Sequence, residues 1–229
     1  MARQIICVHV GTKYPDEYVL RLHAGCKRNI KQDFVFTVIS DRVSYGINGM
    51  RIVPVSSMRY PESRLWWHKM QAFDPAIAED ENLLLDIDVV VTGNLDKFFD
   101  HKPDQFLICQ DFNRQWLRGY VRCNSSVFRF NKTIGSNIWT DWSKNNSVGR
   151  HRGDQDWMDD NIANKIWWPR SWAQSWKWEV YRGGKKSPHE EKYHMETTEL
   201  DPDCSILIFH GKPDPHDVTD RLVTDSWIV

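Results

Sequence analysis

The fold is decided by residues 82–94, NLLLDIDVVVTGN. Residues 82–85 contain the apolar run Leu83–Leu85, which predicts a buried strand, and two aspartates follow it within three residues. Because side chains alternate between the two faces of an extended chain, Asp86 and Asp88 are expected to point the same way. Two carboxylates at a strand end suit a divalent cation bound to phosphate. They could also cap the turn before Gly93 or act in a phosphatase.

The residues before this stretch alternate between strand and helix patterns. Strands are predicted at residues 4–10, 34–40 and 51–55, and helices at 16–29 and 63–73. Such an alternation predicts an α/β fold, with an open and mostly parallel sheet flanked by helices. Its ligand crevice is expected at the carboxyl ends of the strands.

The residues after it are less regular. Strands are predicted at 106–110, 126–130 and 205–209, and helices at 133–145 and 154–161, with a polar, turn-rich and mobile loop at about 182–203. Nothing in the 229 residues marks a linker, so we expect a single domain. Within it, residues 1–100 form the regular half and residues 101–229 the less regular half.

Composition narrows the classes of partner. A net charge of −1 argues against nucleic acid or an anionic membrane, and no segment is long enough to span a bilayer or resembles a signal peptide. A cytoplasmic location is therefore expected, while the oligomeric state is not indicated. No C-x-x-C spacing occurs among the five cysteines, which predicts reduced thiols. The cysteines are Cys7, Cys26, Cys109, Cys123 and Cys204.

Twelve tryptophans, crowded between Trp157 and Trp178, allow two interpretations. Indole rings form platforms for sugars, but they are also large core side chains. The first interpretation would suit a carbohydrate-binding protein without catalytic activity.

A second cluster of polar residues follows the last predicted strand. His210 stands at its end, and Gly211, Lys212 and Pro213 form a turn that could carry the lysine ammonium group to a phosphate. An imidazole together with two carboxylates favours Mn²⁺ over Mg²⁺ or Ca²⁺, which prefer oxygen ligands. A lone histidine at a strand end can equally be structural.

Taken together, these motifs resemble glycosyltransferase family 8, the group of glycogenin and the lipopolysaccharide galactosyltransferases, and its relatives with the GT-A fold. Residues 83–95 are similar to the D-x-D region of that family. Residues 123–131 (CNSSVFRFN), 153–157 (GDQDW) and 209–213 (FHGKP) are similar to its N-S-G-V, D-Q-D and C-terminal histidine–lysine motifs, in the same order. The likeness extends from the first strand to about residue 215.

Three departures from the family pattern stand out. Ser126 replaces the usual glycine, the spacing between His210 and Lys212 is compressed, and Asp214 replaces the usual aromatic residue. The match is therefore closer to the broader GT-A clan than to the family itself.

The resemblance implies transfer of a hexose from a UDP-sugar to the hydroxyl of a saccharide or other acceptor, with retention of configuration and with Mn²⁺ or Mg²⁺. It assigns metal binding to Asp86, Asp88 and His210. Donor contacts are implied for Val10, Gly11, Thr12, Tyr14, Asp41, Lys69, Ile87, Asp111, Asn124, Ser125, Gly211 and Lys212. The catalytic position is implied for Asp154, Gln155 and Asp156, with Gln155 near the anomeric carbon and Tyr14 on the uracil.

Plainer roles exist for several of these residues. Lys69 could pair with a carboxylate, Asp154 could cap a helix, and Asn124 could close a turn. A haloacid dehalogenase-like phosphohydrolase, with Asp86 as the phosphorylated residue, is the rival enzyme class. The sequence names neither the donor sugar nor the acceptor, which is expected against the tryptophan-rich segment and the loop from residue 182.

Overall fold

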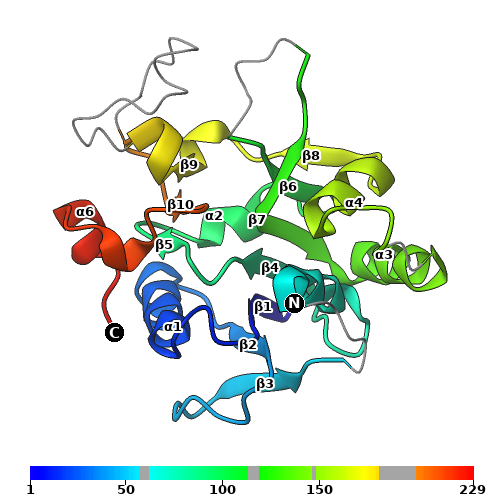
Figure 1. Cartoon of the computed structure of the whole chain (residues 1–229), viewed down its shortest axis with the longest axis horizontal. Helices are drawn as coiled ribbons and strands as arrows, with labels where there is room; N and C mark the ends of the chain where they lie inside the picture. The colour runs from blue at the N-terminus through cyan, green and yellow to red at the C-terminus, as the bar shows by residue number, and fades with distance from the viewer. Residues whose placement is uncertain (57–61, 113–118, 146–147, 181–199) are drawn as a thin grey trace.

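The computed structural model describes residues 1–56, 62–112, 119–145, 148–180 and 200–229. Its centre is a seven-stranded sheet in the order β3-β2-β1-β4-β7-β6-β8 (Figure 1). The strands are β1 (Arg3–His9), β2 (Val35–Ser40), β3 (Met50–Pro54), β4 (Glu81–Leu85), β6 (Phe106–Gln110), β7 (Cys123–Asn131) and β8 (Lys165–Trp167). The α/β fold predicted from the sequence, with a mostly parallel sheet, is confirmed.

Strand β7 is the exception to the parallel arrangement. It runs antiparallel to both of its neighbours, β4 and β6. In this register Leu85, the last residue of β4, pairs with Val127, so the start of β7 extends past the end of β4. The amide of Asp86 donates a hydrogen bond of 2.8 Å to the carbonyl of Ser126. The antiparallel strand therefore brings residues 124–126 beside the D-x-D motif.

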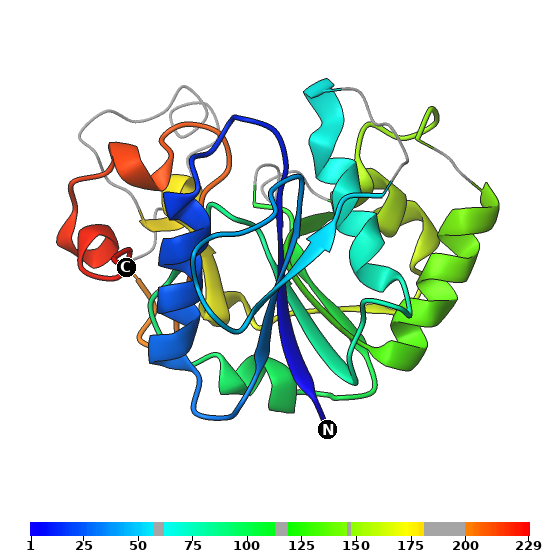
Figure 2. The ribbon, with the colours of Figure 1, turned by 90° about the horizontal axis from the view of Figure 1, so that it is seen from below.

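Helices cover both faces of the sheet (Figure 2). Helix α1 (Glu17–Asn29) lies on one face, and η1 (Glu62–Phe73), α3 (Lys132–Asn145) and α4 (Asp154–Asn161) lie on the other. The strands supply two separate cores, since Ile5 and Cys7 pack with α1 whereas Ile6 packs with η1 and α3. The predicted helix at 63–73 is found as a 3-10 helix, interrupted at Arg64, where φ is −141°.

A second sheet of three strands lies beside α1, in the order β5-β10-β9. It consists of β5 (Val90–Val91), β10 (Ile206–Ile208) and β9 (Ala173–Ser175). The predicted strand at 205–209 is thus present, but it pairs antiparallel with β5, immediately after the D-x-D motif. This pairing brings the segment ending at His210 toward the end of β4.

The remaining elements are short, and the sequence did not predict them. They are α2 (Asp96–Asp100), η2 (Arg170–Trp172), the π-helix η3 (Trp176–Val180), η4 (Pro215–Asp217) and α6 (Arg221–Thr224). The predicted loop at 182–203 lies mostly outside the described residues. Among those described, no helix is long and apolar enough to cross a membrane. All five cysteines are buried and free, as predicted.

The crowded tryptophans belong to the core. Trp157, Trp168, Trp176 and Trp178 are all buried. Their packing accounts for the composition of this segment without a sugar, which removes the main reason for the carbohydrate-binding interpretation.

Gly135, in α3, provides a test of the packing between this helix and the sheet. A Cβ atom there would lie 2.8 Å from two ring atoms of Phe130, a fully buried side chain. Alanine normally stabilises a helix by about 1 kcal/mol relative to glycine, but overpacking a core costs about 1–3 kcal/mol. We therefore expect Gly135→Ala to lower the free energy of unfolding, measured by urea denaturation. Gly149→Ala, where a Cβ would meet nothing within 4 Å, is expected to be neutral; an unchanged Gly135→Ala variant would contradict the packing.

Candidate active site

The D-x-D motif turns away from β4 at the floor of a cavity. Asp86 is partly exposed and Asp88 is buried, and the amide of Val89 donates to the carbonyl of Asp86 (3.3 Å), which closes a turn. The cavity has a volume of about 250 Å³. It is lined by residues 8–10, 13–14, 65–66, 69 and 86–88. The loop after β1, the η1 helix and the end of β4 thus meet at one place.

Lys69 connects the D-x-D motif to the start of α4. Its Nζ lies 2.6 Å from Oδ1 of Asp86 and 3.7 Å from Oδ2 of Asp154, and it donates to the carbonyl and the hydroxyl of Ser125 at 3.3 and 3.2 Å. Burial by itself would lower the pKa of Lys69, but Asp154 and Asp86 raise it above its usual value. Lys69 is therefore a buried cation, and it does pair with carboxylates.

Asp88 has a different partner. The hydroxyl of Tyr14 donates to its Oδ2 at 2.7 Å, and Nζ of Lys13 donates to the same hydroxyl at 2.6 Å. Burial, and then the neighbouring Asp86, raise the pKa of Asp88 to about 7. The carboxylates of Asp86 and Asp88 repel each other, and a hard divalent cation bound to both would relieve this repulsion. The residues present therefore fit the metal that the resemblance implies.

The loop after β1 is shaped by Asp41. Gly11 adopts a φ of +77°, and its amide donates to Oδ2 of Asp41 at 2.9 Å. A Cβ atom on Gly11 would lie 2.7 Å from the side chain of Leu65, so a larger residue would collide with η1. In this structure Asp41 positions the predicted nucleotide loop, in which Thr12 is exposed and Val10 lines the cavity.

The residues at the start of β7 and α4 also meet. The amide of Ser125 donates to Oε1 of Gln155 (3.4 Å), while Oδ1 of Asn124 accepts from the amide of Ser126 (3.0 Å) and closes a turn. Gly153, not Asp154, is the N-cap of α4. Burial raises the pKa of Asp154, with Lys69 opposing, and the side chain of Asp156 is partly buried.

His210 lies apart from the two aspartates. Its Nε2 is 2.6 Å from the hydroxyl of Ser175, and its ring stacks on Phe112 with centroids 5.9 Å apart. Burial, and then Lys177, lower the pKa of His210 to about 4, so its imidazole is neutral. Asp111, on the same side, accepts a hydrogen bond of 3.1 Å from Tyr120.

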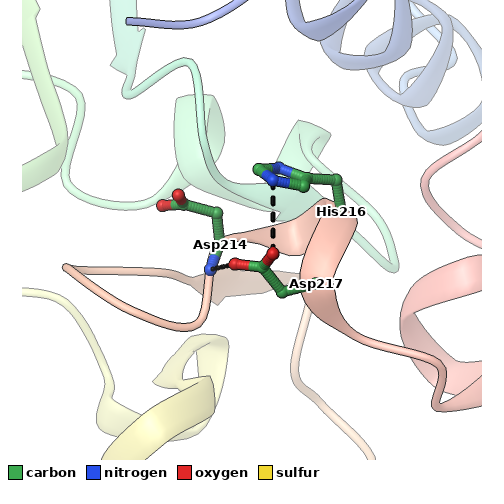
Figure 3. A group of neighbouring side chains, drawn as sticks. All are labelled: Asp214, His216 and Asp217. Atoms are coloured by element: carbon green, nitrogen blue, oxygen red, sulfur yellow. Dashed lines mark hydrogen bonds and ion pairs between the residues drawn. The ribbon is translucent and has the colours of Figure 1, made fainter.

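The ligand atoms of Asp86, Asp88 and His210 do not all lie within 4.8 Å of one another. Within the described part of the chain, the group that meets this criterion is Asp214, His216 and Asp217 (Figure 3).

That group already has a cation. Nζ of Lys212 lies 2.8 Å from Asp214 and 2.9 Å from Asp217, and Oδ2 of Asp217 also accepts from the amide of Asp214 at 3.0 Å. The side chain of Lys212 is 71% exposed. Lys212 and the adjacent Gly211 thus form a turn in which the lysine is tied to its own carboxylates instead of facing the cavity.

Four cavity residues were not singled out by the sequence, namely Val8, His9, Leu65 and Trp66. His9 bonds Tyr45 through Nδ1 (2.7 Å) and the carbonyl of Tyr14 through Nε2 (2.8 Å), so it supports the loop. In the sequence, His9 was indicated only by its place near the end of a predicted strand. Leu65 and Trp66 were indicated only by their places four and three residues before Lys69.

No protein-family model matches the sequence, and no curated protein is similar to it. Solved structures are similar. The galactosyltransferase LgtC, in complex with donor and acceptor sugar analogs, superposes with a TM-score of 0.65 at 15% identity, over 99% of this chain and 97% of LgtC. The glycosyltransferase GlyE of Streptococcus pneumoniae TIGR4, in its apo form, gives 0.69 at 15% identity, over 99% of this chain and 59% of GlyE.

A glycosyltransferase involved in glycosylation of the major capsid of PBCV-1 gives a TM-score of 0.56 at 13% identity, over 90% of this chain and 93% of that one. The chain has the GT-A fold. In this GT-A chain Asp86 follows β4, the fourth strand along the sequence, whereas the haloacid dehalogenase motif normally follows the first strand of its fold. The rival interpretation therefore loses its structural basis.

Proposed function

We propose that this GT-A protein is a metal-dependent glycosyltransferase, which moves a hexose from a UDP-sugar to an acceptor hydroxyl with retention of configuration. One observation carries the proposal. Lys69, Asp86 and Asp88 line a cavity at the carboxyl end of β4, where α/β folds bind their ligands, and Lys69 also pairs with Asp154. The similarity of the fold to that of glycosyltransferases supports the same reading.

In this proposal Asp86 and Asp88 hold Mn²⁺ or Mg²⁺, and His210 joins them when its imidazole leaves Ser175. Its lowered pKa keeps the imidazole unprotonated and able to bind a metal. The bound cation would supply charge neutralisation on the diphosphate. The first hundred residues bind the nucleotide, with Tyr14 against the uracil, and the remainder binds the sugar and the acceptor.

The protein's own groups then orient the reaction. Lys69 holds Asp86 and Asp154 in place, and the amide of Ser125 fixes the side chain of Gln155. The exposed side chain of Lys212 would have to leave Asp214 and Asp217 before its ammonium group contacts the departing diphosphate. An amide such as Gln155 is a poor nucleophile, so the acceptor hydroxyl attacks on the face from which the diphosphate departs.

Binding of UDP should depend on the metal. Without a cation, the diphosphate would meet the carboxylates of Asp86 and Asp88 directly. We expect titration calorimetry with Mn²⁺ to give a dissociation constant for UDP about 100-fold lower than with EDTA. Uridine, which has no phosphate, is the control and should bind equally in both. UDP affinity that is unchanged by EDTA would contradict the proposed metal site.

The activity itself is tested with a panel of nucleotide sugars and Mn²⁺. Release of UDP from a UDP-hexose supports the proposal, and an α-linked product from a UDP-α-sugar, identified by NMR, supports retention. A β-linked product would overturn retention alone. Rapid hydrolysis of p-nitrophenyl phosphate would overturn transfer.

A further inference from the structure

Trp66 differs from the other tryptophans that the structure describes. It is 46% exposed, whereas the rest of them are buried or partly buried. Its neighbour Trp67 is fully buried and stacks on Trp142 at 5.2 Å. Trp67 thus anchors this part of η1 in the core, while Trp66 is left at the surface.

The position of Trp66 is more informative than its exposure, since single exposed hydrophobic residues are common. Trp66 lines the same cavity as Lys69, Asp86 and Asp88. The edge of the indole also lies against Gly153, where a Cβ atom would be 2.7 Å from Nε1 and 3.2 Å from Cδ1. Trp66 therefore spans from the cavity to the residue before Asp154, and Gly153 leaves room for the ring.

The depth of each group separates the two substrates. Asp88, Lys69 and Asp154 are buried at 9%, 8% and 3% exposure, so the donor's diphosphate and its sugar belong at this depth. Trp66 lines the same cavity but is exposed to solvent. In the proposed reaction the acceptor enters from solvent, so it is the substrate that would contact the exposed indole on its way to Gln155.

We propose that Trp66 is the platform on which a pyranose ring of the acceptor stacks, so that the acceptor is a saccharide. A flat indole that is 46% exposed can bury the apolar C–H face of a pyranose, and an open-chain hydroxyl compound offers no such face. The inference rests on the proposed function and adds the class of acceptor to it.

The test compares pyranoside acceptors with glycerol, in wild type and in three variants. Wild type, Trp66→Phe, Trp66→Leu and the control Trp139→Leu are assayed with UDP-glucose and UDP-galactose, using methyl glucopyranosides and galactopyranosides or glycerol as acceptors. Trp139 packs partly buried on α3 and does not line the cavity, so its exchange removes an indole elsewhere.

We expect Trp66→Leu to raise the KM for the pyranosides about tenfold, and Trp66→Phe to retain most of the affinity. Because Trp66 also lines the donor cavity, the KM for the donor and the slow release of UDP without acceptor should change in both variants, but by less than the KM for the pyranosides. Saturation-transfer NMR of the same pyranosides, with UDP and Mn²⁺, should show the same loss without any need for turnover. Trp139→Leu should behave as wild type in all these measurements.

The proposal is overturned if Trp66→Leu leaves the pyranoside KM and the NMR signal within twofold of wild type. It is also overturned if the variant loses donor hydrolysis to the same degree as transfer, or if wild type uses glycerol as well as it uses the pyranosides. A failure of the proposed function itself is distinguishable, since wild type would then release no UDP from either donor.

Discussion

Asp86→Asn is expected to lower transfer by roughly 10²- to 10³-fold, the usual cost of removing one group that stabilises developing charge. The carboxylate of Asp86 is one of two oxygen donors at the end of β4, and its Oδ1 is 2.6 Å from Lys69. An amide cannot supply the second negative charge, so the metal would bind more weakly. Rates of UDP release with increasing Mn²⁺ measure the effect, and the variant should need a higher Mn²⁺ concentration.

The same variant has a second expected signature, in the stability of the protein. Burial and Asp86 together raise the pKa of Asp88, so removing the charge of Asp86 relieves a repulsion. The variant also takes one carboxylate from Lys69, which keeps Asp154 at 3.7 Å, so Asp86→Asn should lose activity with only a small change in its urea midpoint. Asp33→Asn, at an exposed aspartate outside the cavity, is the control for the loss of one negative charge. Full activity in Asp86→Asn at wild-type Mn²⁺ levels would mean that the metal, if required, is held elsewhere.

The D-x-D strand was predictable because its signal is local. Residues 82–85 are buried in the structure, and the two aspartates follow them as the pattern indicates. The direction of β7 was not predictable in this way, because apolar strands have the same pattern whether they run parallel or antiparallel. Direction depends on which strands become neighbours, and this is settled by contacts far apart in the chain.

For His210 and Lys212, too, the local contacts could be predicted from the sequence and the long-range contacts could not. Lys212 pairs with Asp214 and Asp217, two and five residues away, so the sequence contained the competing partners of the lysine. The hydrogen bond between His210 and Ser175 joins residues 35 positions apart, and nothing in either segment indicates it. Spacing therefore singled out the candidate side chains, while their long-range partners could be found only in the structure.

Lys69 is the position where the effect on stability and the effect on activity can be separated. Lys69→Met should lower the free energy of unfolding by about 3 kcal/mol, since it leaves carboxylates without their buried cation. The side chain of Asp154 is only 4% exposed, so water cannot replace the lost charge there. Transfer should fall about 100-fold, because Asp86 and Asp154 are no longer held in place. Urea midpoints and UDP release measure the two effects, with the exposed Lys144→Met as control.

The double variant Lys69→Met with Asp154→Asn separates the effect of Lys69 on stability from its effect on activity. Neutralising Asp154 removes the most buried unpaired carboxylate, so the double variant should recover much of the lost stability, and the two changes should not add. Its activity should stay low, because the cation beside Asp86 is still missing. If activity returned together with stability, Lys69 would be only a structural residue, since the D-x-D motif would then act without its cation. If Lys69→Met were as stable as wild type, Lys69, Asp86 and Asp154 would not form the buried network of charges on which the proposed site depends.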